Sequence, residues 1–145
     1  MVKVLIKKIN PDVELPSYKT LGASGLDLMA FINHPIKLLP KSSCLVPTGL
    51  SVAFSEEYEI QIRPRSGLAA KNNISVLNTP GTIDSDYRGE IKIILFNHGT
   101  KEFVINNKDR VAQMVLLPIH KMDLEEVKSL PDTLRGKGGF GSTGK

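Results

Sequence analysis

Two aspartates stand in a turn-rich segment that runs from Asn78 to Gly89. Asp84 and Asp86 are two positions apart, so their side chains share a face on an extended chain and need not share one in a turn. Either carboxylate could act as a general base or hold a metal ion. Asn78 carries both a donor and an acceptor, as recognition of an amide-like base edge requires. The plainer interpretation is a solvent-facing turn, for which Asp, Ser and Gly are common.

A second segment, residues 63–70, reads as the end of a strand followed by the start of a helix. Free backbone N–H groups at a helix N-terminus attract phosphate, and Ser66 adds a hydroxyl donor. Gly67 would let the backbone approach an anion closely, and Arg65 can pair with a phosphate through two donors. Taken alone, the segment is more typical of an ordinary helix start beside surface arginines.

The C-terminal segment, residues 135–145, has five glycines in eleven residues and cannot hold a strand or helix by itself. Its glycine-rich backbone can wrap a phosphate chain through N–H groups. Arg135 and Lys137 supply charge, and Phe140 offers a flat face on which stacking a base is worth roughly 1–3 kcal/mol. Two interpretations are open: a disordered terminus, or an arm that becomes ordered over a ligand.

Metal-binding and nucleophile patterns are otherwise missing from the sequence. The three histidines are scattered and none has zinc spacing with a cysteine. The single cysteine, Cys44, lies in a segment typical of a strand, so we interpret it as a buried, inert thiol. Magnesium commonly binds through substrate phosphates with few protein ligands, so the lack of a ligand pattern does not argue against it.

Length and composition indicate one globular domain of 145 residues with 41% hydrophobic and 23% charged residues. The net charge of +4 suits an anionic ligand. With 6% aromatic residues, nothing beyond this charge favours binding to nucleic acid. The N-terminus is too charged for a signal peptide, and no apolar run is long enough to span a bilayer. We therefore expect a cytoplasmic protein without membrane or nucleic-acid partners.

Short runs of β-type residues must position these segments, and Pro, Asn and Gly separate them. The expected strands are Val2–Ile9, Leu26–Ala30, Ile36–Leu39, Cys44–Val46, Leu50–Phe54, Tyr58–Ile62, Glu90–Phe96, Glu102–Ile105 and Ala112–Pro118. Helical periodicity is scarce, with one or two turns expected at 66–72 and another turn possible at 122–127. This pattern predicts an all-β sandwich, barrel or jelly roll. We expect a β domain at residues 1–134 followed by the flexible arm, residues 135–145.

Five ordered segments resemble the five sequence motifs of the trimeric dUTPase family, and they extend from residue 23 almost to the C-terminus. They are Ala23–Leu28, Arg63–Ala69, Asn78–Gly89, Asp109–Val115 and Arg135–Gly144. The one departure is Ser24, where alanine is common. The resemblance implies a jelly-roll-like subunit with one short helix at most, in a homotrimer whose active sites lie between subunits. It also implies that the C-terminal arm closes over a site built by its neighbours.

The implied activity is magnesium-dependent hydrolysis of dUTP to dUMP and pyrophosphate, which keeps uracil out of DNA and supplies dUMP for thymidylate synthesis. By resemblance, Asp84 is the general base that activates water against the α-phosphate, and Asn78 reads the uracil edge. Tyr87 packs beneath the deoxyribose and excludes a ribose, and Asp27 helps to hold Mg²⁺ through water. The remaining implied substrate-binding residues are Arg65, Ser66, Gly67, Gly81, Gln113, Arg135, Phe140 and Gly141.

Three other functions remain to be weighed against the hydrolase. A related dCTP deaminase would share the fold and motif order, but Gly67 and the complete fifth segment favour the hydrolase. A non-catalytic nucleotide-binding regulator is disfavoured by the presence of Asp84 and Tyr87. A basic nucleic-acid-binding protein would show salt-sensitive binding to DNA.

Overall fold

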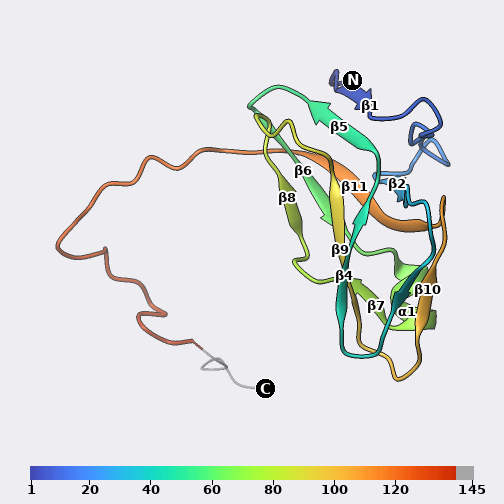
Figure 1. The fold of residues 1–145 in the computed structure, drawn as a ribbon. Helices are drawn as coiled ribbons and strands as arrows, with labels where there is room; N and C mark the ends of the chain where they lie inside the picture. Colours follow the sequence, from blue (N-terminus) through green and yellow to red (C-terminus); the bar gives the residue numbers. More distant parts are fainter. Residues whose placement is uncertain (140–145) are drawn as a thin grey trace.

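Alternation of buried and exposed side chains marks the strands in a computed structural model that describes residues 1–139 (Figure 1). Strand β9 (Lys92–Asn97), for example, buries every second residue. The other strands are β1 (Leu5–Lys8), β2 (Leu26–Met29), β3 (Ile36–Leu38), β4 (Ser43–Pro47), β5 (Leu50–Ala53), β6 (Tyr58–Arg63), β7 (Ile74–Val76), β8 (Gly81–Ile83), β10 (Phe103–Ile105) and β11 (Arg110–Pro118). The one described helix is α1 (Ser66–Asn72).

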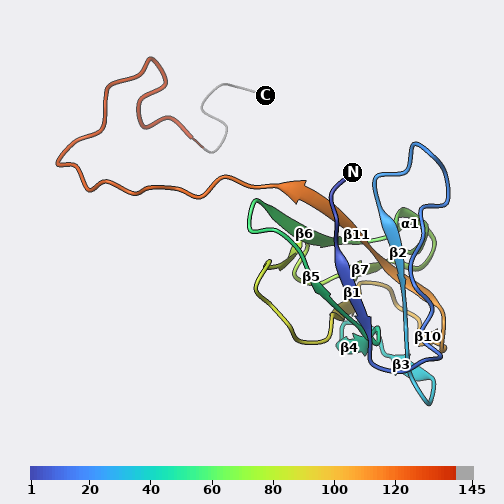
Figure 2. The same ribbon diagram turned by 90° about the horizontal axis from the view of Figure 1, so that it is seen from above.

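The strands form four small antiparallel sheets that pack around one core (Figures 1 and 2). The largest has the order β2-β11-β6-β8, and the next has the order β4-β9-β7. Strands β1 and β5 form a pair, as do β3 and β10. Neighbours in a sheet are mostly distant in sequence. Strand β11, for example, pairs with β2 on one side and with β6 on the other. This arrangement is the all-β, jelly-roll-like fold that the sequence predicts.

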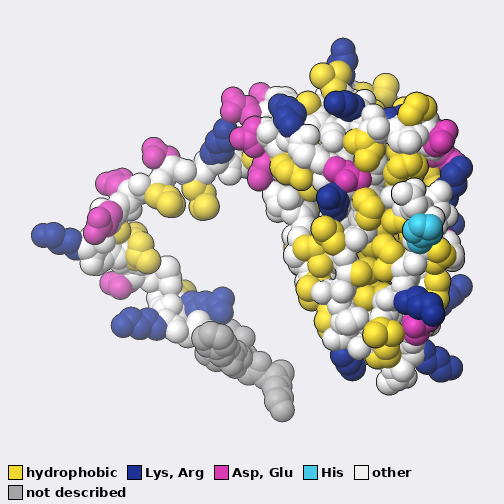
Figure 3. Space-filling model, in the orientation of Figure 1, with side chains coloured by type: hydrophobic (Ala, Val, Ile, Leu, Met, Phe, Trp, Pro, Cys, Tyr) yellow, Lys and Arg dark blue, Asp and Glu magenta, His cyan; other side chains and the backbone are white. Residues whose placement is uncertain are grey.

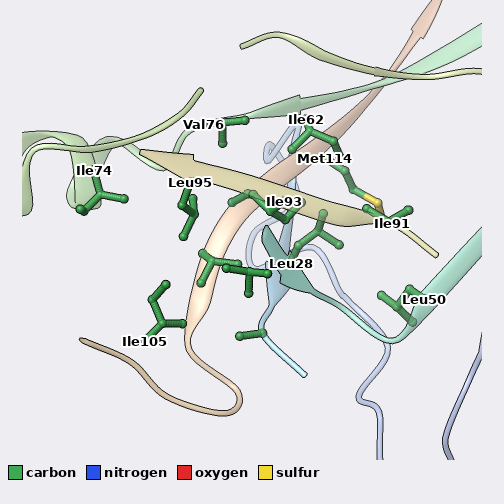
Figure 4. Close-up of a cluster of buried hydrophobic side chains, with 14 of the residues drawn as sticks. Leu28, Leu50, Ile62, Ile74, Val76, Ile91, Ile93, Leu95, Ile105 and Met114 are labelled. Carbon is green, nitrogen blue, oxygen red and sulfur yellow. The ribbon is translucent and has the colours of Figure 1, made fainter. Parts of the chain in front are cut away.

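The core is filled by branched aliphatic side chains from the inner faces of these sheets (Figure 4). Leu28, Ile93, Leu95 and Ile105 are each at most 1% exposed. The buried Asn97 is fully paired there, since its Nδ2 donates to the carbonyls of Leu38 at 3.0 Å and Lys101 at 2.8 Å. A buried amide with partners costs little and fixes the connection after β9.

Truncating the core should destabilise the fold more than truncating the surface. Ile93→Ala should lower the free energy of unfolding by about 2–5 kcal/mol, because it leaves a cavity among close-packed side chains. Val104→Ala, at a side chain that is 40% exposed, should cost less than about 0.5 kcal/mol. Urea denaturation followed by circular dichroism measures both. Equal losses would show that Ile93 is not in a packed core.

The strands expected from sequence are confirmed with ends that differ by a few residues, and α1 is confirmed at 66–72. Two strands were missed. Strand β7 is too short to show alternation, and β8 lies inside the turn-rich segment, where Thr79-Pro80-Gly81 reads as a loop. The turn considered at 122–127 is not helical, because nothing in the body packs against it.

After β11 ends at Pro118, residues 119–139 leave the body as an extended strand-free segment (Figures 1 and 2). Its start is tied down, since Ile119 N–H donates to Glu57 O at 2.9 Å and Lys121 Nζ lies 2.8 Å from Glu56 Oε2. The hydrogen bond from Lys121 and the positive charge of Lys121 lower the pKa of the Glu56 carboxyl. The boundary expected at residue 135 stays a prediction. No helix within residues 1–139 is long and apolar enough to cross a membrane.

Candidate active site

The four-stranded sheet brings three of the motif segments together. Gln113 on β11 is paired with Asp27 on β2 and with Arg63 on β6, so these three positions form one row across the sheet. Side chains in such a row lie on the same face. The sheet therefore gathers the segments at 23–28, 63–69 and 109–115 at one end of the body.

Asp27 is held by two arginines in this row's neighbourhood. Its Oδ1 accepts from Arg65 Nε at 2.9 Å, and its Oδ2 accepts from Arg110 Nη1 at 3.1 Å. Arg65 Nη1 also donates to the carbonyl of Arg110 at 3.0 Å. Charge-assisted hydrogen bonds of this kind are stronger than neutral ones, so they fix the Arg65 guanidinium. Sequence reasoning missed Arg110, because its ion pair with Asp27 depends on how β11 packs beside β2.

Gln113 contacts the chain that leads from β6 to α1. Its Nε2 donates to the carbonyl of Pro64 at 2.9 Å, which fixes the chain just before α1. Gly25 makes room for this contact, since a Cβ atom at that position would overlap Gln113 Oε1. The expected phosphate contact of Gln113 stays a prediction, and the structure adds this positioning contact.

Helix α1 starts at Ser66 with Arg65 as its N-cap residue, and no side chain caps it. Ser66 and Gly67 are both exposed, and a Cβ at Gly67 would meet nothing within 4 Å. The N–H groups of a first helical turn have no partner within the helix. The residues expected to contact phosphate therefore present open donors beside the Arg65 guanidinium.

The other edge of the same sheet carries the turn-rich segment. Gly81 is buried where β8 pairs with Ile62 of β6. A Cβ at Gly81 would lie 3.1 Å from Asn78 Nδ2, so the glycine lets the Asn78 side chain lie against the hairpin backbone. Asn78 is itself exposed and available to a ligand.

Asp84 lies just beyond β8 on the wall of an open hollow of about 540 Å³. The hollow is lined by Phe54, Glu56, Asp84, Ser85, Asp86, Arg88, Ile119 and Lys121. The turn is braced locally, because Arg88 Nη1 donates to Ser85 O at 2.6 Å and Tyr87 N donates to Asp84 O at 3.1 Å. Both Asp84 and Asp86 are exposed, so solvent reaches either carboxylate.

Tyr87 folds back over the end of the turn. Its hydroxyl donates to Glu90 O at 3.1 Å, and Gly89 leaves room for the ring, since a Cβ there would overlap the phenol. The side chain is still 44% exposed. Its partly exposed ring is therefore held against Gly89, at the end of the turn that Asp84 begins.

The two edges of the sheet do not meet within one chain. Ile83 lies opposite Ile60, and the chain from Ile60 to Arg65 spans roughly 16 Å. Arg65 also turns towards β2, three strand spacings or roughly 14 Å from β8. From Ile83 the chain runs on to Asp84 in the direction that leads away from Arg65. The candidate base and the candidate phosphate site of one chain are therefore about 20 Å apart by these two offsets.

Arg135, the described member of the arm residues expected in the site, lies apart from it. Arg135 Nε donates to the nearby Gly138 carbonyl at 2.8 Å, in a segment that lies off the body in both views (Figures 1 and 2). Phe140 and Gly141 lie outside the described residues. Whether the arm closes over a site stays a prediction.

Metal ligation and thiol chemistry find little support in residues 1–139. They contain no group of three or more His, Cys, Asp or Glu side chains that could hold a metal ion. Cys44 is half-buried, and burial raises the pKa of its thiol, so it is mostly protonated at neutral pH. The sequence predicts a buried thiol, so the degree of burial differs from that prediction, and the inertness of the thiol stays a prediction.

Solved structures share this fold. A mutant dUTPase of Staphylococcus bacteriophage 80alpha with dUpNHpp superimposes with a TM-score of 0.88 at 22% identity, covering 99% of each chain. A dUTPase mutant from phage phi11 of S. aureus, described with a structural Mg(II) ion, has a TM-score of 0.79 at 20% identity and covers 88% of this chain and 97% of its own. The fold is thus that of dUTPases.

Sequence comparison is more specific. The dUTPase family model matches residues 11–144. A deoxyuridine 5'-triphosphate nucleotidohydrolase of Hydrogenobaculum sp. is 52% identical over 143 residues, 99% of each chain. Another, of Bdellovibrio bacteriovorus, is 53% identical and covers 98% of this chain and 96% of its own. The chain belongs to the dUTPase family.

Proposed function

We propose that the chain hydrolyses dUTP to dUMP and pyrophosphate. The observation that carries this proposal is the pair of half-sites on one sheet: Arg65, clamped beside an open helix start, and Asp84, exposed beside the Asn78 hairpin. The Arg65 half-site suits the phosphates of a triphosphate. The other half-site suits binding of a nucleobase by Asn78 and acceptance of a proton by Asp84. Relatives about 52% identical over the full chain carry the name of this activity.

Recognition of the nucleoside rests on the hairpin edge. Asn78 would bind the uracil edge, and its close approach to Gly81 supports a pocket walled by backbone. A methyl group in apolar contact discriminates by only ~1–3 kcal/mol, so rejection of thymine requires a steric clash with that wall. The Tyr87 ring, fixed through Glu90, would pack beneath the deoxyribose and leave no room for a 2′-hydroxyl.

The chemical step assigned to the chain is a single displacement at the α-phosphorus. Asp84 would accept a proton from a water molecule while the oxygen of that water forms a bond to the α-phosphorus. The bond from the α-phosphorus to the bridging oxygen would break, and pyrophosphate would leave with that oxygen. Arg65, Ser66 and Gly67 would stabilise the negative charge on the phosphates, because preorganised donors act where charge develops.

Magnesium is the proposed cofactor, held mainly by the substrate phosphates. The described residues contain no group of three or more possible ligands, so a magnesium ion here would take most of its ligands from the phosphates, as it often does. When bound, the ion would neutralise phosphate charge. The resemblance assigns Asp27 to this ion through water.

We propose that the site is completed by another copy of the chain in a homotrimer. The separation of about 20 Å between the half-sites supports this, because a base must lie within hydrogen-bond reach of its water. An apolar outer face supports it too: Leu45 is paired with Ile94, and Leu77 N–H donates to Ile94 O. Leu45 and Leu77 are each more than half exposed, and hydrophobic side chains gather on this side of the body (Figure 3).

The extended segment after β11 supports the same assembly. Met122, Leu124 and Leu130 are each more than 80% exposed on it. Large apolar side chains that are exposed together on one segment are typical of a surface that another chain covers. A neighbour that receives this segment would also receive Arg135, which the family resemblance assigns to the γ-phosphate.

Release of pyrophosphate from dUTP, dTTP, dCTP and UTP, each with magnesium and with a chelator, tests the proposal. We expect rapid release from dUTP alone, dependent on magnesium. Ammonia release from dCTP would favour a deaminase on the same fold. Tight binding of dUTP without turnover would favour a regulator, and either result would reject the hydrolase.

A further inference from the structure

The contacts around Asp27 form a closed loop of three hydrogen bonds. The carboxylate binds Arg65 through one oxygen at 2.9 Å and Arg110 through the other at 3.1 Å. Arg65 then binds the backbone carbonyl of Arg110 at 3.0 Å. Each of the two arginines is thereby linked to Asp27 and to the other arginine, so the three residues form one hydrogen-bonded unit.

Charge and burial indicate what this unit can bind. The Asp27 and Arg65 side chains are 20% and 24% exposed, while Arg110 is half exposed. One carboxylate between two guanidinium groups leaves a net charge of +1. Such a cluster attracts an anion and repels a divalent cation. Each carboxylate oxygen accepts a hydrogen bond from one arginine and keeps a second acceptor position, but the two guanidinium groups more than neutralise the negative charge that a hydrated cation would need.

We propose that Asp27 and Arg110 are positioning residues that hold the Arg65 guanidinium for the triphosphate, and that Asp27 does not hold magnesium through water. The inference rests on the proposed function. A guanidinium fixed before the substrate arrives needs no reorganisation when charge develops. Displacement of a positioned group by about 1 Å can cost roughly 100-fold in rate. Loss of the clamp, meaning the contacts of Asp27 and Arg110 with Arg65, should therefore lower mainly kcat.

The decisive variant is Asp27→Asn, which keeps the shape of the side chain and removes the charge that holds both arginines. We expect kcat for dUTP to fall about 10- to 100-fold. Arg110→Gln should cause a similar loss. The double variant should have a kcat no lower than that of the more impaired single variant, because both substitutions act through Arg65. Losses that multiply in the double variant would contradict the shared unit.

A binding measurement separates positioning from metal ligation. Calorimetry with an imido analogue of dUTP gives the Kd with magnesium and with a chelator. We expect magnesium to tighten binding by the same factor in Asp27→Asn as in the unaltered protein. Loss of this tightening in Asp27→Asn would assign Asp27 to the metal and overturn the proposal.

Glu14→Gln is the matched control, because it neutralises a carboxylate paired with one exposed lysine, Lys108, at 2.6 Å. It should leave kcat and the magnesium effect unchanged. An unaltered protein that does not hydrolyse dUTP would refute the proposed function. An active protein whose Asp27→Asn variant keeps full kcat would refute only the role of the clamp.

Discussion

Asp84→Asn should bind dUTP about as tightly as the unaltered protein and lose most of its turnover. The amide keeps the shape of the carboxylate but cannot accept a proton, and a positioned general base contributes about 100- to 10,000-fold to a rate. Asp84 is exposed and lies on an open hollow, so the substitution should not disturb the fold. Steady-state pyrophosphate release gives kcat, and calorimetry with an imido analogue gives the affinity.

Asp86→Asn is the matched comparison, since Asp86 lines the same hollow two residues away. The family resemblance favours Asp84 as the base, so Asp86→Asn should keep most of the activity. A rate close to that of the unaltered protein in Asp84→Asn, with a large loss in Asp86→Asn, would reverse the assignment.

Removal of residues 135–145 should cripple hydrolysis and leave the assembly intact. If Phe140 stacks on the uracil, its loss alone costs roughly 1–3 kcal/mol, which corresponds to about 5- to 150-fold in kcat/KM. Loss of the Arg135 charge should add to this. The contacts that hold the start of the extended segment, Ile119 to Glu57 and Lys121 to Glu56, precede the deletion and should persist.

The truncated protein should therefore elute from a sizing column as the same oligomer and unfold at the same urea concentration. Full activity after truncation would show that the tail is an ordinary disordered terminus. Loss of the oligomer would show that residues 135–145 hold the subunits together instead of closing a site. Phe140→Ala in the full chain then separates stacking from the rest of the arm.

Much of the fold follows from local pattern. The alternation in β9 and the long apolar run of β11 identify strands without any knowledge of their partners. One or two helical turns were expected at residues 66–72 after Pro64-Arg65, and α1 lies there; the structure adds that Asn73 ends it in the left-handed conformation, with φ of 57°. Strand β8 was not predicted, because turn-forming residues stand directly before it. Its three residues gain their extended conformation from pairing with Ile60–Ile62, which are distant in sequence.

The site divides in the same way between local and distant information. The residue types at 63–67 allow an anion site and those at Asn78 and Asp84 allow a ligand-reading turn, but taken alone each segment is as well explained by an ordinary helix start or a solvent-facing turn. The resemblance to the ordered family motifs is what favours the functional interpretations. The partnership of Asp27 with Arg65 and Arg110 depends on the register of β2 against β11, which no local pattern contains. The distance between the two half-sites likewise depends on the strand order of the sheet.

Complementation between two inactive variants tests most directly the claim that one site is built from two copies. Asp84→Asn and Arg65→Ala chains carrying different tags are co-expressed, and mixed assemblies are isolated by both tags in turn. In a ring of three copies, every mixed assembly has about one third of its sites with both residues intact. We predict recovery of about one third of the unaltered activity, far above either variant alone. Mixed assemblies as inactive as the separate variants would contradict a site shared between copies.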